Sequence, residues 1–388
     1  MNNKQLTYFH DAQLIKDSKG TYFSTVTNNT MLDRYKVITN NIAVALRIVI
    51  SDNVRESNQL QNIKVYEIPN PNTIRGLLLE RYKIKRQIRD IVKNTDYVIA
   101  RLPSTIGHYA VKYARKFNKR YLIEAVACPF DALWNHSLVG KILAPIEYIK
   151  MRSSVKNSKY SVYVTNNFLQ NRYPTQGNNI NISNVYLKRI DDNILNKRID
   201  KINSSSPSKV ILGTIGHLNV KYKGQHLIIK ALSKLKKVLP EITFEYQIVG
   251  DGSKDRLLKL AKKYNVQDNV NFVGRLNHDN IFKWVDDLTI YVQPSRQEGL
   301  PRSVIEAMSR AVPTIGSNIA GIPELLNPNC IFNIKRNPVI NFINVLKTFD
   351  VNKQIIAANE NFDKSHDFDY SIIENRRTIF LKKFKSDQ

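Results

Sequence analysis

Two glutamates, Glu298 and Glu306, are separated by seven residues and surround a predicted strand-to-helix junction. A short apolar run over 288–292 predicts a buried strand, and the apolar spacing over 302–310 predicts a helix. Pro301 suits the first helical position, where its missing N–H costs no hydrogen bond. Free amides at such a helix start bind anions. The segment therefore predicts a phosphate site with a carboxylate on each side to hold sugar hydroxyls, although a capped amphipathic helix with two solvated glutamates is the alternative.

Further glycine-rich and proline-containing segments surround this junction in the second half of the chain. In order, they are residues 213–216, 223–225, 248–252, 272–275, 293–295, 311–317 and 321–326. Together with the two glutamates, they resemble the donor site of retaining glycosyltransferase family 4. The resemblance is carried by residues 210–326. It implies the GT-B architecture, in which two Rossmann-like domains face each other across a cleft.

The resemblance also implies roles for individual residues. Lys223 would contact the diphosphate, Glu298 the hydroxyls of the donor sugar, and Glu306 the ribose hydroxyls, for which a carboxylate is a suitable acceptor. Lys223 and Glu298 are therefore expected to be catalytic. The remaining donor-binding residues that it implies are Gly20, Gly216, His217, Gly224, Arg275, Gly299, Leu300, Pro301 and Ser303.

Two positions depart from the family pattern. His217 stands where the family usually has an arginine, so its charge would depend on pH. Glu124 ends a predicted buried strand near the place where many family members have a histidine. We expect Glu124 to be a catalytic residue of the acceptor-binding domain that either orients the acceptor or acts as a base.

The sequence predicts neither a metal nor a cofactor, and the nucleotide sugar is expected as a co-substrate. Asp367 and Asp369 have the form of a metal-binding pair, but they precede the last predicted helix and are expected to cap it. No other group of His, Asp and Glu has the spacing of metal ligands. Lys223 and backbone amides would then neutralise the diphosphate of the donor.

The order of predicted elements indicates an α/β protein with two doubly wound domains. Apolar runs alternate with amphipathic segments before a polar, Pro-containing linker at 203–208, and the alternation then restarts. We expect an acceptor-binding domain over 1–200, a nucleotide-sugar-binding domain over 201–365, and a helix over 366–388 that packs back on the first domain.

The chain has 388 residues and a net charge of +26. Such a charge suits an anionic partner, and a Lys- and Asn-rich composition that reflects an AT-rich genome is the competing explanation. The mixture of apolar and basic residues over 139–152 predicts a surface for an anionic membrane leaflet, although an amphipathic helix packed on the core is the alternative. With no apolar signal segment at the start, we expect a cytoplasmic, metal-independent hexosyltransferase that is peripheral on the inner face of the cell membrane.

The predicted partners are a nucleotide sugar and a glycan or lipid-linked acceptor, as in cell-surface polysaccharide synthesis. Two alternatives remain at this point. A nucleotide-sugar 2-epimerase shares the architecture but needs additional acid and base groups. A basic nucleic-acid-binding protein would explain the charge, although the chain has no recognisable nucleic-acid-binding motif, and we expect no nucleic-acid partner.

Overall fold

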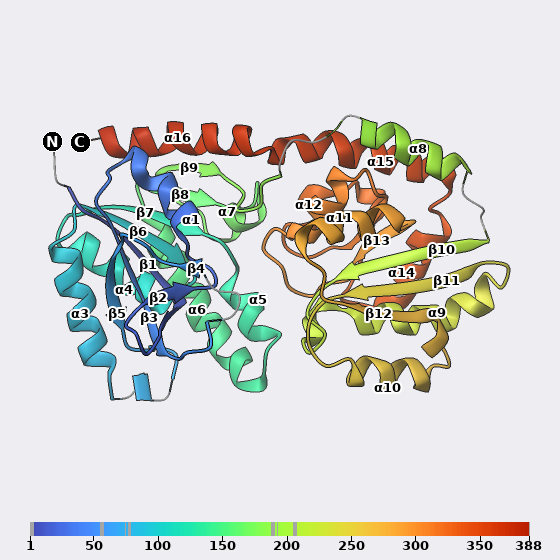
Figure 1. Ribbon diagram of the computed structural model, residues 1–388, viewed down its shortest axis with the longest axis horizontal. Helices are drawn as coiled ribbons and strands as arrows, with labels where there is room; N and C mark the ends of the chain where they lie inside the picture. Colours follow the sequence, from blue (N-terminus) through green and yellow to red (C-terminus); the bar gives the residue numbers. More distant parts are fainter. Residues whose placement is uncertain are drawn as a thin grey trace. The chain divides into compact units, whose positions relative to one another are not determined.

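The computed structural model describes residues 4–54, 58–73, 75–76, 79–187, 191, 193–204 and 208–387. The chain forms two compact units: unit 1 contains residues 1–182 and 374–388, and unit 2 contains residues 183–373. Each unit is built on its own sheet, with helices packed on it (Figure 1). The predicted α/β class with two Rossmann-like units is confirmed.

Unit 1 is built on a mainly parallel sheet. Its strands are β1 (Leu6–Lys16), β2 (Tyr22–Ser24), β3 (Ile42–Ile50), β4 (Asn58–Gln59), β5 (Lys64–Ile68), β6 (Tyr97–Leu102), β7 (Arg120–Ala125), β8 (Tyr160–Tyr163) and β9 (Asn178–Asn181). The parallel strands follow the order β5-β3-β1-β6-β7-β8-β9. Strand β2 pairs antiparallel with β1, and β4 pairs antiparallel with β2. The near-continuous apolar sequence of β3 is typical of a strand that is covered on both faces.

The helices of unit 1 are α1 (Asn29–Asp33), α3 (Arg81–Lys93), α4 (Thr105–Lys116), α5 (Pro129–Trp134), α6 (Leu138–Lys156) and α7 (Phe168–Arg172). Helix α4 packs Ile106, Ala110 and Ala114 into the core. Its N-terminus is capped by Ser104, whose hydroxyl accepts from the amide of Gly107 at 2.9 Å. Capping satisfies amides that would otherwise lack a partner, and it fixes where the helix begins.

Strand β1 was not predicted, because a β-bulge interrupts its pattern. The pairing with β3 shifts register between His10 and Gln13. Asp11 lies in the bulge, and its carboxylate accepts from the amides of Thr105 and Ile106 at 2.8 and 2.9 Å. The acidic side chain inside a strand therefore anchors the start of α4, where the helix dipole favours a negative charge.

Unit 2 has a six-stranded parallel sheet in the order β12-β11-β10-β13-β14-β15. These strands are β10 (Lys209–Ile215), β11 (Thr243–Val249), β12 (Val270–Gly274), β13 (Ile290–Gln293), β14 (Thr314–Ser317) and β15 (Ile331–Phe332). Its helices are α8 (Asn193–Ser204), α9 (Gln225–Val238), α10 (Asp255–Lys263), α11 (His278–Asp287), α12 (Arg302–Ser309), α13 (Ile322–Leu325), α14 (Pro338–Lys347) and α15 (Val351–Ser365), and a 3-10 turn spans Lys221–Lys223. The order reverses between β10 and β13, which is where α/β sheets place their ligands.

The boundary between the units lies earlier than the predicted one at residue 200. Helix α8 belongs to unit 2, because Arg198 is 5% exposed and donates to the carbonyl of Leu288 at 2.8 Å. The predicted linker at 203–208 begins inside this helix, and residues 205–207 lie outside the described part of the chain.

The last helix, α16 (Tyr370–Ser386), enters unit 1 from residue 374 onward. Phe384 packs against Tyr97 and Tyr160, with ring centroids 5.9 and 5.3 Å apart. Asp369 accepts from the amide of Ser371 at 2.7 Å just before this helix. The Asp367–Asp369 segment therefore caps a helix, as expected.

Candidate functional site

Glu298 is held in one position by three hydrogen bonds in the loop between β13 and α12. Its Oε1 atom accepts from Lys223 Nζ at 2.7 Å, from Ser295 Oγ at 2.7 Å and from Gln293 Nε2 at 2.9 Å. Gln293 and Ser295 are fully buried. The Glu298 side chain is 10% exposed. Because a largely buried carboxylate is costly without such partners, the donors at the end of β13, just after it and in the turn before α9 stabilise its charge.

A second layer of side chains holds Gln293 in turn. Its Oε1 atom accepts from Tyr291 OH at 2.8 Å and from Ser303 Oγ at 3.2 Å. The amide of Ile215, at the end of β10, donates to the Tyr291 hydroxyl at 3.2 Å. The network therefore connects β10, β13 and α12, and it fixes the orientation of the Glu298 carboxylate relative to the sheet.

Both glutamates line one cavity of about 400 Å³ in unit 2, which we call the Glu298 cavity. Burial raises the pKa of Glu306, and the positive charge of Arg302 acts in the opposite direction. Pro301, Arg302 and Ser303 line the cavity, so it lies at the N-terminus of α12, where anions bind favourably. The residues that line the cavity are Ile215, Gly216, Lys223, Ile281, Glu298, Pro301, Arg302, Ser303 and Glu306.

The predicted start of α12 is shifted by one residue. Pro301 is the N-cap, with φ −74° and ψ 117°, and Arg302 is the first helical residue. A proline is tolerated there for the same reason as in the first turn, because no intrahelical bond needs its N–H. Arg302, which was not predicted as a donor-site residue, also lines the cavity.

Two glycines allow loops to approach this site closely. Gly224 has φ +77°, and a Cβ atom there would lie 1.8 Å from the carbonyl oxygen of Pro294. Gly250 has φ +158°, and a Cβ atom there would lie 2.2 Å from the carbonyl oxygen of Gly216. Gly224 is therefore explained by backbone packing beside the cavity, because only glycine fits there without displacing the loop.

Several residues predicted to bind the donor do not line the cavity. His217 is exposed, and its Nδ1 accepts from the amide of Asn219 at 3.3 Å. Arg275 is exposed just after β12. Gly299 uses its carbonyl to accept from the amide of Gly321 at 3.0 Å. Gly224 and Leu300 do not line the cavity either.

Gly20 and Glu124 belong to unit 1. Gly20 has φ +79° in a tight turn whose amides donate to Asp17. Glu124 is 5% exposed near the end of β7, and its Oε1 accepts from Tyr35 OH at 2.6 Å. The structure thus places these two residues in unit 1, whereas the Glu298 cavity is lined by residues of unit 2.

Glu124 is part of a largely buried row of polar residues on neighbouring strands, and the sequence did not reveal that His10 belongs to it. Arg101 of β6 pairs with Glu124 of β7. On the other side of β6, Ala100 pairs with Phe9 of β1, so the next residue of β1, His10, lies beside Arg101. The Arg101 Nη1 atom is 4.0 Å from Glu124 Oε2. His10 was missed because it lies in the bulged strand, and only its polar type inside an apolar run could have drawn attention to it.

The charges in this row shift the pKa values of its members. Burial alone would raise the pKa of Glu124, but Arg34, Arg101 and the hydrogen bond from Tyr35 lower it overall. Burial and the charge of Arg101 lower the pKa of His10 to about 4. The second carboxylate oxygen of Glu124 and the Nδ1 atom of His10 have no hydrogen-bond partner among the described residues. Buried polar atoms that lack a hydrogen-bond partner can bind a ligand, so this row is a candidate binding site.

Comparison with known proteins agrees with this geometry. The model for "Glycosyl transferases group 1" matches residues 196–337, which contain the whole lining of the Glu298 cavity. The "Protein CapJ" of Staphylococcus aureus is 32% identical over 97% of this chain and 90% of its own length. The chain belongs to the glycosyltransferase group 1 family.

One further relative of this glycosyltransferase matches a smaller part of the sequence, and a solved structure shares its fold at low sequence identity. The "O-antigen biosynthesis glycosyltransferase WclY" of Escherichia coli is 32% identical over 40% of this chain and 43% of its own length. The Anabaena protein HepE, solved in complex with UDP, has a TM-score of 0.64 at 15% identity, over 98% of this chain and 100% of HepE. The glycosyltransferase therefore has the GT-B fold.

Proposed function

We propose that the chain transfers a sugar from a nucleoside-diphosphate sugar to a glycan or lipid-linked acceptor during cell-surface polysaccharide synthesis. One observation carries this proposal: Lys223, Glu298 and Glu306 line a single cavity at the start of α12. The UDP in the HepE structure and the O-antigen role in the name of WclY support it. We further propose that transfer needs no metal or cofactor and retains the anomeric configuration, and the family resemblance supports retention.

The leaving diphosphate needs positive charge where it develops negative charge. Lys223 has three ammonium hydrogens, of which one is donated to Glu298. The other two can reach phosphate oxygens while that pair stays intact. Arg302 and the first amides of α12 add a second source of positive potential at the same cavity. This combination can neutralise a diphosphate through protein groups alone.

The two carboxylates suit hydroxyl groups of the donor. Glu298 already accepts three hydrogen bonds through Oε1, which leaves Oε2 for a sugar hydroxyl. Glu306 is 5% exposed, and burial raises its pKa, so hydroxyl donors would stabilise its charged form. We therefore assign the sugar to Glu298 and the ribose to Glu306. A donor without the ribose hydroxyls would leave the buried carboxylate of Glu306 without these hydrogen-bond donors, which is costly.

In unit 1 the row of His10, Arg101 and Glu124 is our proposed contact for the acceptor. A general base works best with a pKa near the operating pH. Because the pKa of Glu124 is lowered rather than raised, the carboxylate is a poor base and a good orienting acceptor for a hydroxyl group. Of the two roles expected for Glu124, we therefore propose orientation of the acceptor.

The surface of α6 supports an anionic membrane leaflet as a partner. None of the described helices is long and apolar enough to cross a bilayer. Yet α6 exposes a stripe of large apolar side chains, which are Leu138, Val139, Ile142, Ile146 and Ile149, between 56% and 79% exposed. Lys141 and Arg152 are exposed on the same helix. Apolar residues flanked by cations are typical of a surface that rests on anionic lipid.

Thermal-shift measurements with UDP, GDP and their sugar conjugates test the proposed donor. A ligand present at many times its Kd raises the Tm, so one nucleotide series should raise it and the matching nucleosides should do so less. No shift with any nucleotide would contradict the proposal. Incubation with the donor alone separates transfer from epimerisation, since an epimerase needs no acceptor. The coupling constant of the anomeric proton in the product then reports retention.

A further inference from the structure

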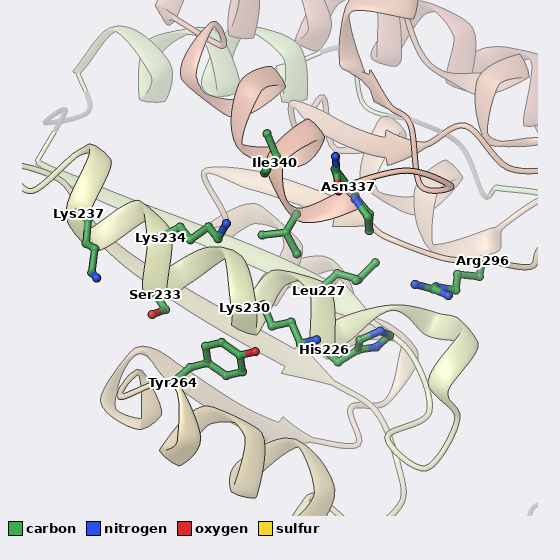
Figure 2. Close-up of a pocket in the computed structure, with 12 residues that line it drawn as sticks. His226, Leu227, Lys230, Ser233, Lys234, Lys237, Tyr264, Arg296, Asn337 and Ile340 are labelled. Atoms are coloured by element: carbon green, nitrogen blue, oxygen red, sulfur yellow. The ribbon is translucent and has the colours of Figure 1, made fainter.

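Unit 2 contains a second cavity, of about 540 Å³, which we call the α9 cavity (Figure 2). It lies along one face of α9, next to Tyr264 and the start of α14. Its lining shares no residue with that of the Glu298 cavity. The lining residues are His226, Leu227, Lys230, Ser233, Lys234, Lys237, Tyr264, Arg296, Asn337, Pro338, Val339 and Ile340.

The charge of this cavity has a single sign. Lys230, Lys234 and Lys237 follow helical spacing on α9, and Arg296 adds a fourth cation from the loop before Glu298. The lining contains no Asp or Glu, and among the described residues the three lysines form no ion pair. Like charges four residues apart destabilise a helix. A bound anion would remove this repulsion.

His226 lies within this positive potential. Burial lowers its pKa to about 4, and the charges of Arg296, Arg256, Lys230 and Lys221 act in the same direction. Its Nδ1 atom is buried and has no hydrogen-bond partner in the described part of the protein. An anion in the cavity would offset the neighbouring cations and could accept a hydrogen bond from the ring.

The rest of the cavity lining consists of apolar and aromatic side chains and the N-terminus of α14. Leu227 and Ile340 supply apolar surface, and the ammonium of Lys230 lies 6.0 Å from the centroid of the Tyr264 ring. Helix α14 begins at Pro338 beside the cavity, and no side chain caps that end among the described residues. The volume of the cavity falls within the range of small-molecule sites.

We propose that the α9 cavity is a binding site for a small phosphate-bearing molecule, separate from the donor site. Lysines are point charges that suit the compact charge of a phosphate group. Tyr264 and the apolar wall fit the sugar or base that such a molecule carries. The proposal goes beyond glycosyl transfer, because it depends on different residues and predicts binding in a chain whose donor site is disabled.

Isothermal titration of the full chain with inorganic pyrophosphate tests the proposal. The titration uses a Lys223→Ala background, which weakens phosphate binding at the Glu298 cavity. Pyrophosphate is expected to bind this variant at one site per chain. Replacing Lys230 and Lys234 together by Gln should weaken that binding by about tenfold or more, because two charge-assisted contacts are lost.

A matched control replaces Lys262 and Lys263 of α10 by Gln, with the same loss of charge on exposed residues outside the lining. This control should bind pyrophosphate within about twofold of the background variant. Equal weakening by both double variants would assign binding to general charge and overturn the proposal. Circular dichroism and Tm of each variant confirm that it is folded.

Two further measurements test whether binding takes place inside the cavity and whether the site prefers phosphate to carboxylate. Ser233→Trp keeps every charge but fills part of the cavity, so it should also weaken pyrophosphate binding. Unchanged binding in this variant would contradict a cavity site. Glucose 6-phosphate is expected to bind, and a disaccharide that carries carboxylates alone is expected to bind more weakly. Equal affinity for the carboxylate compound would overturn the assignment to phosphate.

Discussion

Lys223→Ala is the substitution that separates phosphate binding from the folding of unit 2. In the free protein, Lys223 donates to Glu298 at 2.7 Å, but Gln293 and Ser295 donate to the same carboxylate oxygen. Removing the lysine therefore leaves Glu298 with two hydrogen bonds, and we expect a folded protein. The substitution should instead reduce the affinity for the ligand, because the positive charge near the diphosphate disappears.

The expected magnitude follows from one charge-assisted contact. A hydrogen bond to a charged group contributes roughly 1.5–3 kcal/mol. Since each 1.4 kcal/mol changes a binding constant about tenfold, Lys223→Ala should weaken binding of the preferred nucleoside diphosphate by roughly ten- to hundredfold. The corresponding nucleoside has no phosphate, so its affinity should change by less than about twofold.

Isothermal titration with the diphosphate and the nucleoside measures both numbers on one protein. Lys221→Ala is the matched control, because Lys221 is exposed in the same turn and does not line the Glu298 cavity. It should leave both affinities close to those of the parent. If Lys223→Ala binds the diphosphate like the parent, or loses the nucleoside equally, Lys223 does not hold the phosphates.

Three further predictions follow from the structure. Because burial raises the pKa of Glu306, the folded state loses stability as the pH rises through that pKa. Glu306→Gln should therefore raise the Tm at neutral pH, and this gain in Tm should shrink as the pH falls through the ordinary glutamate range. The same substitution should weaken donor binding about tenfold. Transfer should survive excess EDTA, and loss that Mg²⁺ or Mn²⁺ restores would contradict this. Neutralising Lys141, Lys150 and Arg152 together, or Ile146→Asp alone, should weaken sedimentation with anionic vesicles and leave donor affinity unchanged; unaltered sedimentation would place membrane contact elsewhere.

Much of unit 2 could be predicted because its signals are local. The apolar run before Gln293 and the helical spacing after Pro301 define β13 and α12, and both elements have nearly the predicted bounds. Lys223, Glu298 and Glu306 lie close together because parallel strands bring their carboxyl ends to one edge of the sheet. Their common place in the lining of the Glu298 cavity follows from this arrangement of strands.

The parts that could not be predicted depend on contacts between distant segments. The β1 bulge breaks the pattern of a central strand, and with it His10 was missed. Helix α8 belongs to unit 2 through Arg198, whose partner is a carbonyl far along the chain. The support of Glu298 by Gln293 and Ser295 is a matter of side-chain geometry, which the spacing of residues does not contain.

The central claim is that the Glu298 cavity holds the donor during sugar transfer. Transfer of a radiolabelled sugar from its nucleotide to lipid-linked acceptors, compared between the parent and Glu298→Gln at saturating donor, tests it most directly. Glu298→Gln keeps the side-chain shape and removes the charge that faces Lys223. We therefore expect it to bind the nucleoside diphosphate but to transfer the sugar at most about one hundredth as fast as the parent. Transfer by Glu298→Gln at the rate of the parent would show that the Glu298 cavity does not hold the donor during transfer.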